Sequence, residues 1–398
     1  MMLLSRSQLQ DRVEVGLGRS PIVALLGPRQ CGKTTLAQLI QKQRNAAYFD
    51  LENPQDTMRL QNPQLTLSLL TGLVILDETQ HRPDLMPVLR VLADRKPLSC
   101  RFLLLGSASP DLVRQSSETL AGRIEFIEMA GFTLAETGPE AQSSLWLRGG
   151  FPDSFLAATD ADSWAWRDNF ISTFLERDIP RLGIQIPPLT LRRFWMMVSH
   201  YHGQVWNASD IAASLGVAHT TTRRYLDLLS GAFVLRQLPP WLENVGKRTV
   251  KSPKIYIRDS GLLHSLLNLP SHHTLLGHPK LGASWEGFAL EQVFAFVNSR
   301  HAYFWGTHAG AELDLLVMLE GKRYGFECKY ADAPGTTKSM RIALADLGLE
   351  HLWVIYPGAE RYVLDKRITV VPAREIPALA EELKTGARHA SPHRREEA

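Results

Sequence analysis

The sequence predicts an α/β protein, on three observations. Its 398 residues are 44% hydrophobic and 21% charged, a balance typical of a globular protein with two or three domains. Between residues 21 and 132, short apolar runs alternate with helical stretches, which predicts a parallel sheet with helices on its faces. Beyond residue 189 the pattern changes twice, first to helices followed by a strand and then to a second α/β segment.

These changes of pattern divide the chain into five segments. The proline pair Pro187-Pro188 marks one boundary, because proline interrupts regular structure. We expect a parallel-sheet domain, a helical connector rich in aromatic residues, a winged helix-turn-helix, a second α/β domain and a disordered polar tail. The segments cover residues 1–145, 146–188, 189–260, 261–380 and 381–398.

Composition restricts the location and the partners of the chain. No apolar run approaches the roughly 20 residues that a membrane helix needs, and the first residues lack the apolar core of a secretory signal. The three cysteines, Cys31, Cys100 and Cys328, leave one unpaired in any disulfide scheme, which suits a reducing compartment. We therefore expect a cytoplasmic protein with no membrane partner. The net charge of +3 is too small to indicate a polyanion partner by itself.

The segment LLGPRQCGKTTL, residues 25–36, has the spacing of a phosphate-binding loop, with an apolar run before it and a helical stretch after it. In such a loop the backbone amides and the helix N-terminus surround the phosphates, Lys33 reaches the β and γ oxygens, and Thr34 binds magnesium. An ordinary glycine-rich turn is the alternative. The residues expected to contact the nucleotide here are Gly27, Pro28, Arg29, Gln30, Cys31, Gly32, Lys33, Thr34 and Thr35.

Two acids and an arginine extend this expected site. The apolar run GLVIL ends in Asp77 and Glu78. We expect Asp77 to hold magnesium through water and Glu78 to polarise the attacking water, with a solvated strand end as the alternative. Arg123, in the turn LAGR, is a candidate for supplying positive charge in the transition state, either to its own nucleotide or to that of a neighbouring subunit in a homo-oligomer. A surface ion pair is the alternative for Arg123.

Five segments resemble the prokaryotic AAA-family ATPases that carry a C-terminal domain of uncharacterised function. They are GPRQCGKTTL, YFDLENP, VILDETQ, LLLGSAS and LAGRIEFIEMAGFTLAE. The resemblance spans nearly the whole chain and implies ATP binding and hydrolysis. It also places Ser107, at the end of RFLLLGS, opposite the γ-phosphate. Cys31 stands where the family commonly has a small aliphatic residue, and we expect no effect on phosphate binding because the loop acts through its backbone.

Residues 189–241 have the order of a winged helix-turn-helix. The apolar residues of the third helix that recur at helical spacing and are expected in the core are Tyr225, Leu226, Leu229 and Phe233. The residues expected near the helix start, where a recognition helix meets double-stranded DNA, are Thr221, Thr222, Arg223 and Arg224. Contact with a protein partner is the alternative, because two arginines make a thin basic patch.

The hairpin ELDLLVMLEGKRYGFECKY predicts a second site. Strand alternation places Glu327 and Lys329 on one face and Cys328 on the other, and the register of the hairpin brings Asp314 beside them. The expected metal ligands are Asp314 and Glu327, since carboxylates suit Mg2+, and Lys329 would orient water or help to deprotonate it. An exposed hairpin with an ion pair is the alternative.

Together with the preceding helix, which bears Glu286, and the following helix and strand, this hairpin resembles the PD-(D/E)XK restriction-endonuclease-like fold. The resemblance assigns the acid to Asp314 and the E-x-K sequence to residues 327–329. We therefore predict an ATP- and Mg2+-dependent AAA-type protein whose nucleotide state governs a DNA-directed C-terminal half, which is a candidate for metal-dependent cleavage. The alternatives are an ATP-gated regulatory or defence switch that binds a protein partner through an inactive scaffold, and an ATP-gated DNA-binding regulator.

Overall fold

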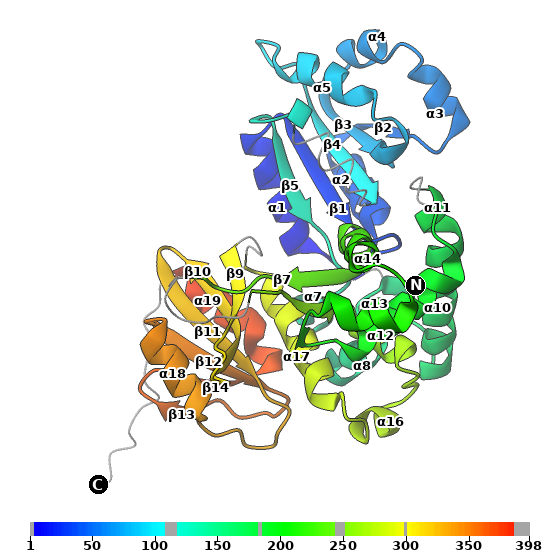
Figure 1. Cartoon of the computed structure of the whole chain (residues 1–398). Helices are drawn as coiled ribbons and strands as arrows, with labels where there is room; N and C mark the ends of the chain where they lie inside the picture. Colours follow the sequence, from blue (N-terminus) through cyan, green and yellow to red (C-terminus); the bar gives the residue numbers. More distant parts are fainter. Residues whose placement is uncertain (1–3, 108–117, 182–184, 243–250, 298–300, 386–398) are drawn as a thin grey trace.

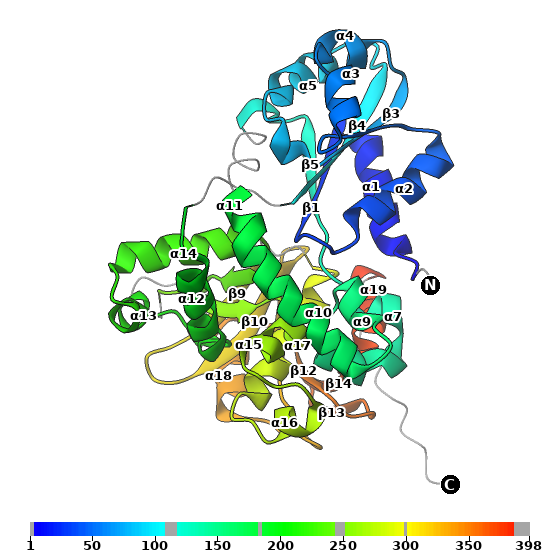
Figure 2. The same ribbon diagram turned by 90° about the vertical axis from the view of Figure 1, so that its right-hand side faces the viewer.

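A computed structural model describes residues 4–107, 118–181, 185–242, 251–297 and 301–385. Figure 1 shows one sheet in the upper part of the molecule (blue to cyan), a second at the lower left (yellow to orange), and green helices beside and between them. The view turned by 90° in Figure 2 places most of these green helices below the first sheet and against the second. Within the described segments, no helix combines the length and the apolar character needed to cross a bilayer.

The N-terminal sheet has five parallel strands in the order β2-β3-β4-β1-β5. Their bounds are β1 Ile22–Gly27, β2 Ala47–Asp50, β3 Gly72–Asp77, β4 Cys100–Ser107 and β5 Ile124–Glu128. The predicted parallel sheet is confirmed. Because the strands are parallel, their carboxyl ends form one edge of the sheet, where the loop after β1 lies near the acids at the end of β3.

Both faces of this sheet are covered by helices. The helices are α1 Ser7–Arg19, α2 Lys33–Arg44, α3 Pro54–Arg59, α4 Pro63–Ser68 and α5 Leu85–Ala93, with a short 3-10 turn at Thr79–His81. In β1, Val23 and Leu25 pack with α1 and α2, whereas Ile22 and Leu26 pack with α4 and α5 on the other face. Alternate residues of a strand point to opposite faces, so a strand that is buried on both sides is apolar throughout. This burial explains the uninterrupted run IVALL.

A run of short helices connects this domain to the rest of the chain. The elements are α7 Leu134–Thr137, η2 Pro139–Ala141, α8 Gln142–Arg148, α9 Pro152–Phe155, α10 Asp160–Thr173, the π-helical turn η3 Phe174–Asp178 and α11 Ile179–Arg181. Helical structure therefore begins earlier than residue 146, where the connector was expected to start. Helix α7 begins with a capping box, in which the Glu136 carboxylate accepts hydrogen bonds from the backbone amide and the hydroxyl of Thr133 at 2.8 and 3.0 Å.

The described residues of the next region form three helices and three short strands. These are α12 Pro188–His200, β6 Gln204–Val205, α13 Ala208–Leu215, α14 His219–Gly231, β7 Leu235–Leu238 and β8 Lys254–Ile257. The strands form an antiparallel sheet in the order β6-β8-β7.

Two expected positions in this region are corrected. Thr222 is fully buried, with its hydroxyl donating to His219 O at 2.8 Å, and Phe233 lies beyond the end of α14 at a φ of 59°.

The C-terminal region is a six-stranded mixed sheet in the order β13-β14-β12-β11-β10-β9. Its strands are β9 Ala302–Gly306, β10 Glu312–Leu319, β11 Lys322–Cys328, β12 His351–Tyr356, β13 Tyr362–Asp365 and β14 Ile368–Pro372. Its helices are α15 Ser260–Leu266, α16 His272–Leu276, α17 Leu281–Phe294, α18 Lys338–Asp346, η5 Ala373–Glu375 and α19 Ile376–Thr385. Helices α17 and α19 cover one face of the sheet, and α18 covers the other.

The expected disordered tail is corrected at its start. Residues 381–385 belong to α19, because this helix buries Leu379 and Ala380 and packs Leu383 against the same core as α17. Burial of this apolar face stabilises the helix beyond residue 380. The remainder of the expected tail, residues 386–398, lies outside the described residues.

Two fully buried histidines lie where the regions meet, and their hydrogen bonds require neutral rings. The backbone amide of Ile257 donates to Nδ1 of His202 at 3.0 Å, so the proton lies on Nε2, which is 3.1 Å from the carbonyl oxygen of Ala283. The ring is packed so closely that a Cβ at Gly287 would lie 2.3 Å from Nε2. Burial lowers the pKa of His202 to about 3.

His264 is held in the opposite tautomer. Its Nδ1 lies 3.0 Å from the carbonyl oxygen of Leu147 and carries the proton. Its Nε2 lies 2.7 Å from Oγ of Ser284, which accepts from Nε1 of Trp146 at 3.0 Å and donates its own hydrogen to the ring. Burial lowers the pKa of His264 to about 3 as well. A proton on Nε2 would break this chain of donors.

We expect the destabilisation caused by His264→Asn to shrink as the pH falls from 7 to 5. The unfolded ring binds a proton near its ordinary pKa of 6.5, whereas the folded ring stays neutral until about pH 3, so its stabilising contribution is present above pH 6.5 and is lost on acidification. The loss by pH 5 is roughly 2 kcal/mol. Urea unfolding of both proteins at pH 7, 6 and 5 measures it. His219→Asn, at an exposed position on α14, is the control. A difference for His264→Asn that does not change with pH contradicts the expectation.

Candidate functional site

The loop after β1 and the start of α2 form the centre of the N-terminal site. Gly27 ends the strand at a point where a Cβ would lie 2.0 Å from the carbonyl oxygen of Met129, so only glycine fits. The turn then passes through two residues with positive φ, Gln30 at 61° and Gly32 at 97°, before α2 begins at Lys33. This conformation directs the loop around the helix N-terminus, where anions bind.

Lys33 is buried in this structure and folded back onto its own loop. Its Nζ donates to the carbonyl oxygens of Gly27 at 3.0 Å and Pro28 at 2.8 Å, and its residue is 6% exposed. The ammonium is therefore held at the loop by two neutral oxygens. Phosphate oxygens are stronger partners for an ammonium than carbonyl oxygens, because they carry charge. A lysine that acts as a phosphate ligand is expected to face solvent rather than the core, so the burial of Lys33 is a correction.

Asp77, at the end of β3, receives hydrogen bonds from three directions. Thr34 Oγ1 and Tyr48 Oη donate to Oδ2 of Asp77 at 2.8 and 2.6 Å, and the backbone amide of Glu78 donates to Oδ1 at 2.8 Å. Burial and the hydrogen bond to Asp77 raise the pKa of Tyr48, so its phenol keeps the proton that it donates. The hydroxyl and the carboxylate oxygens are hard donors of the kind that Mg2+ requires. Tyr48 is a contact that the sequence reasoning missed, although it lies in the strand segment YFD.

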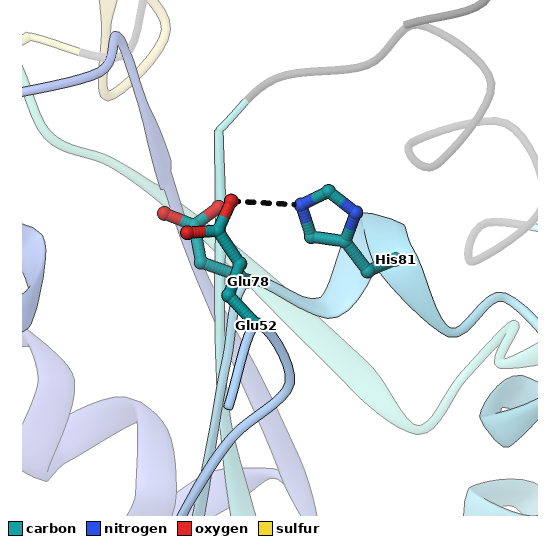
Figure 3. Close-up of side chains that lie close together, drawn as sticks. All are labelled: Glu52, Glu78 and His81. Atoms are coloured by element: carbon teal, nitrogen blue, oxygen red, sulfur yellow. Dashed lines mark hydrogen bonds and ion pairs between the residues drawn. The ribbon is translucent and has the colours of Figure 1, made fainter. Parts of the chain in front are cut away.

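Glu78 follows β3 in a left-handed conformation, with a φ of 55°. This backbone conformation places the carboxylate of Glu78 beside the carboxylate of Glu52 and the imidazole of His81, as Figure 3 shows. Within the described segments, these three side chains form the one group of acids and imidazoles whose ligand atoms all lie within 4.8 Å of one another. His81 Nε2 is 3.2 Å from Glu52 Oε1. Exposed acids of this kind occur widely without a metal, and we assign no metal to them.

Arg29 joins the loop to the helical connector. Its guanidinium donates to Asp178 Oδ1 at 2.7 Å and to Glu52 Oε1 at 3.2 Å. Asp178 ends the π-helical turn η3 and is 5% exposed, and Arg181 lies 3.7 Å from the same Glu52 oxygen. An ion pair thus connects the phosphate-binding loop, or P-loop, to the helical connector. No motif in the sequence indicated this contact.

One expected residue of this site, Arg123, lies elsewhere in the structure. The side chain of a second, Ser107, lies outside the described part. Arg123 precedes β5 at the amino edge of the sheet, about 16 Å along the strand from the edge with the loop. Its guanidinium pairs with both carboxylate oxygens of Asp94, at 2.6 and 2.9 Å. The structure therefore places Arg123 away from the loop of its own chain. Ser107 pairs with Gly27 at the carboxyl edge, but its side chain lies outside the described part of the structure.

A role for Arg123 in a neighbouring subunit stays a prediction. A mixture of Arg123→Ala and Lys33→Ala chains tests it, because recovered ATPase activity requires that one chain completes the site of another.

The hairpin residues of the C-terminal sheet converge as the register predicts. β10 and β11 pair so that Leu315 faces Phe326, which brings Asp314 and Glu327 opposite each other. Oδ2 of Asp314 accepts from the backbone amide of Cys328 at 2.8 Å, and Oε2 of Glu327 accepts from the amide of Asp314 at 3.3 Å. Lys329 Nζ lies 2.8 Å from Oε1 of Glu327. Burial, with the nearby charge of Asp314, raises the pKa of Glu327 to about 8.

Other residues of this cluster come from outside the hairpin. Glu286 on α17 accepts from Tyr256 Oη at 2.5 Å, and burial raises its pKa to about 7. Lys254 of β8 lies 3.3 Å from Glu286 Oε1 and 3.7 Å from Asp314 Oδ1, and it contacts Oε1 of Glu312. The sequence reasoning missed Lys254 and Tyr256, because KIY in a short strand has no spacing typical of a site.

The fold and the loop define the class of the N-terminal part. Residues 19–138 match the family described as AAA domain. The N-terminal part of the chain is therefore an AAA-type P-loop ATPase domain. Residues 139–273 and 281–376 match two families described as domains of unknown function, DUF8612 and DUF4143.

The relatives identify the family of the whole chain. The chain is 53% identical over 375 residues to the uncharacterized proteins Rv2008c of Mycobacterium tuberculosis and Mb2031c of Mycobacterium bovis, which covers 94% of this chain and 85% of each relative. The chain belongs to the family of these mycobacterial proteins. Among solved structures it is similar to the Walker-type ATPase paby2304 of Pyrococcus abyssi, with 14% identity and a TM-score of 0.48 over 67% of this chain and 96% of that one.

Proposed function

We propose that this chain hydrolyses ATP with Mg2+ and uses its nucleotide state to control a C-terminal half that acts on DNA. The observation that carries the ATPase part is the contact of Thr34 Oγ1 with Asp77 Oδ2 at 2.8 Å, directly beside the loop that holds Lys33. In the proposed roles, Lys33 binds the β- and γ-phosphates, Thr34 and Asp77 hold magnesium, and Glu78 orients the attacking water. Magnesium would supply charge neutralisation at the phosphates.

Two ionic links support communication between this site and the rest of the chain. The first is the pair of Arg29 with Asp178 at 2.7 Å, which joins the P-loop to the connector. The second is the contact of Glu128, at the end of β5, with Arg258, which lies 3.4 Å from Glu291 of α17. A change of loop conformation on nucleotide binding would act on both. Double-mutant cycles on ATP affinity measure whether either pair couples the two parts.

We propose that residues 189–260 form a winged helix that contacts DNA through α14. The support is the element order α12, β6, α13, α14, β7 and β8, with the short antiparallel sheet packed beside α14. Tyr225, Leu226 and Leu229 are buried and hold the helix, whereas Arg223 and Arg224 are exposed. Arg223 lies 3.7 Å from Asp227 in an exposed pair, which a phosphate could replace.

Replacing Arg223 and Arg224 by alanine should weaken binding to duplex DNA about tenfold at low salt. The slope of log affinity against log salt should fall by about one unit for each lost phosphate contact. A salt titration of fluorescently labelled duplex measures both quantities. The matched control is Lys42→Ala with Arg44→Ala, which removes two positive charges at the end of α2. Equal weakening in the control, or none in either variant, favours the protein-docking alternative.

A second candidate activity is metal-dependent DNA cleavage at the C-terminal cluster. The observation that favours it is the convergence of the buried Asp314 and Glu327 with the partly exposed Lys329 on paired strands. Carboxylates that are kept close in a region of low exposure are the donors that hold Mg2+, and a lysine beside them can orient water. The competing interpretation is an ATP-gated switch that binds a protein partner and keeps this cluster as scaffold.

We expect nicking of plasmid DNA by the full chain in the presence of ATP and Mg2+ or Mn2+, and no nicking with Ca2+ alone. Asp314→Asn should abolish it by removing a ligand, and Lys329→Ala should abolish it while metal binding persists. Cys328→Ala is the matched control, because its side chain packs in the apolar core and its hydrogen bond to Asp314 comes from the backbone amide. Conversion of supercoiled to nicked plasmid on gels measures the activity. Absence of nicking under all conditions supports the scaffold interpretation.

A further inference from the structure

A buried lysine reaches the acidic cluster of the C-terminal sheet from the three-stranded sheet. Lys254 is the first residue of β8 and is 3% exposed. Its ammonium is surrounded by one oxygen from each of three carboxylates: Glu286 at 3.3 Å, Asp314 at 3.7 Å, and Glu312 in direct contact. The ammonium therefore lies at the centre of the cluster.

The acids of this cluster favour a cation at this position. Glu286, Glu312 and Asp314 bring three acidic groups together, and two of their side chains are largely buried, at 15% and 8% exposure. Buried carboxylates that lack a paired charge or hydrogen bonds are strongly disfavoured. Lys254 supplies that positive charge from within the chain.

A divalent cation would need the same oxygens. Mg2+ and Mn2+ bind carboxylate oxygens directly, at roughly 2.0–2.2 Å, so the three oxygens around the ammonium are donors of the right chemistry. They would have to move closer together around a metal ion, because among the described residues only Glu52, Glu78 and His81 have ligand atoms that all lie within 4.8 Å of one another. The ammonium and a divalent ion cannot share the position, because they repel each other and occupy the same space. Glu327 lies beside this set, and its two oxygens accept from Lys329 and from the amide of Asp314.

We propose that Lys254 is an autoinhibitory contact, and that this cluster binds a divalent cation only after the Lys254 side chain has left it. The inference rests on the metal-dependent activity proposed for the cluster. It adds a gate, the Lys254 side chain, which controls whether the carboxylate oxygens of Glu286, Glu312 and Asp314 can bind a divalent cation.

The strand that carries Lys254 also reaches the ATPase domain. β8 ends at Ile257, and the next residue, Arg258, pairs with Glu128 at the end of β5. Residues 254–258 therefore contact the acidic cluster at their first residue and the ATPase domain at their last. A shift of β5 on nucleotide binding would act on this segment and on the position of Lys254.

The test is Mn2+ binding by the nucleotide-free full chain, measured by electron paramagnetic resonance of free Mn2+ and by the melting temperature with Mn2+ or with EDTA. Lys254→Met removes the ammonium and keeps the aliphatic stem. We expect it to bind one additional Mn2+ at least tenfold more tightly than the wild type and to melt at a higher temperature in Mn2+ than in EDTA. Lys254→Arg is the matched control and should behave as the wild type does, because it keeps the charge.

The double variant Lys254→Met with Asp314→Asn locates the new site, and it should lose the gain. A Lys254→Met protein whose Mn2+ affinity and melting temperature are unchanged overturns the inference, and so does a poorly folded Lys254→Met protein that Mn2+ fails to stabilise. DNA cleavage is scored separately. A Lys254→Met protein that gains Mn2+ binding without cleaving DNA supports the gate and contradicts the nuclease activity. Cleavage by the wild type, with no gain of Mn2+ binding in the variant, contradicts the gate and supports the nuclease activity.

Discussion

Replacing Lys33 by alanine should reduce ATP hydrolysis at least 100-fold, a loss of about 3 kcal/mol of transition-state stabilisation. The ammonium is already positioned at the loop, 3.0 and 2.8 Å from the carbonyl oxygens of Gly27 and Pro28. On nucleotide binding it would exchange these neutral oxygens for charged phosphate oxygens, and alanine offers no substitute. Steady-state phosphate release and the affinity for a fluorescent ATP analogue measure the two consequences.

Because Lys33 is buried, the folded state of the variant must be measured alongside its activity. Removing the ammonium leaves two loop carbonyls without that partner, which costs roughly 1–3 kcal/mol of stability. This cost leaves the domain folded if its stability is typical. The control is Lys42→Ala, an exposed lysine on the last turn of the same helix, which should keep the wild-type rate. Wild-type turnover by Lys33→Ala would refute the assignment of this loop as the catalytic site.

Glu78→Gln should separate binding from hydrolysis. The substitution keeps the size of the side chain and removes its charge, so Lys33, Thr34 and Asp77 stay in place to bind ATP and magnesium. We expect the affinity for ATP to stay within about threefold and the hydrolysis rate to fall about 100-fold, as follows from the loss of a group that activates water. A binding titration and single-turnover hydrolysis by the same preparation measure the two quantities.

Glu52→Gln is the informative comparison for Glu78. Glu52 lies beside Glu78, but its carboxylate pairs with Arg29 and His81. We expect Glu52→Gln to retain hydrolysis within a few-fold. If Glu52→Gln loses hydrolysis and Glu78→Gln keeps it, the water-activating acid is Glu52. If both variants lose ATP binding equally, the proposed division between binding and catalysis is wrong.

The local signals in the sequence were sufficient for the N-terminal fold and for its central site. A phosphate-binding loop is a short continuous segment, so its spacing predicts both its conformation and its position after β1. The position of Asp77 was predictable for a similar reason, since an acid at the end of a buried parallel strand lies at the carboxyl edge of the sheet. The pairing of Asp314 with Glu327 was predictable because a hairpin with a short turn has a register that follows from its length.

Contacts between distant segments were not predictable from the sequence. Arg123 precedes a strand of the same parallel sheet, but only the direction of β5 places it at the amino edge, where Asp94 binds it. Arg29 was expected to contact the nucleotide, whereas its observed partner Asp178 is 149 positions away in a helical connector. Thr222 was expected at a surface for DNA, and the packing of α13 against α14 buried it.

By itself, the sequence determined the parallel sheet, the P-loop and the acids that follow β3, because each depends on residues that are neighbours in the chain or on adjoining strands. Only the tertiary structure decided which charges meet across domains. Lys254 is the clearest instance, since its strand has no unusual pattern and its ammonium acquires a role only when β8 lies against α17 and β10. Such an ion pair depends on where domains pack, and packing is set by buried surfaces that no single segment of sequence contains.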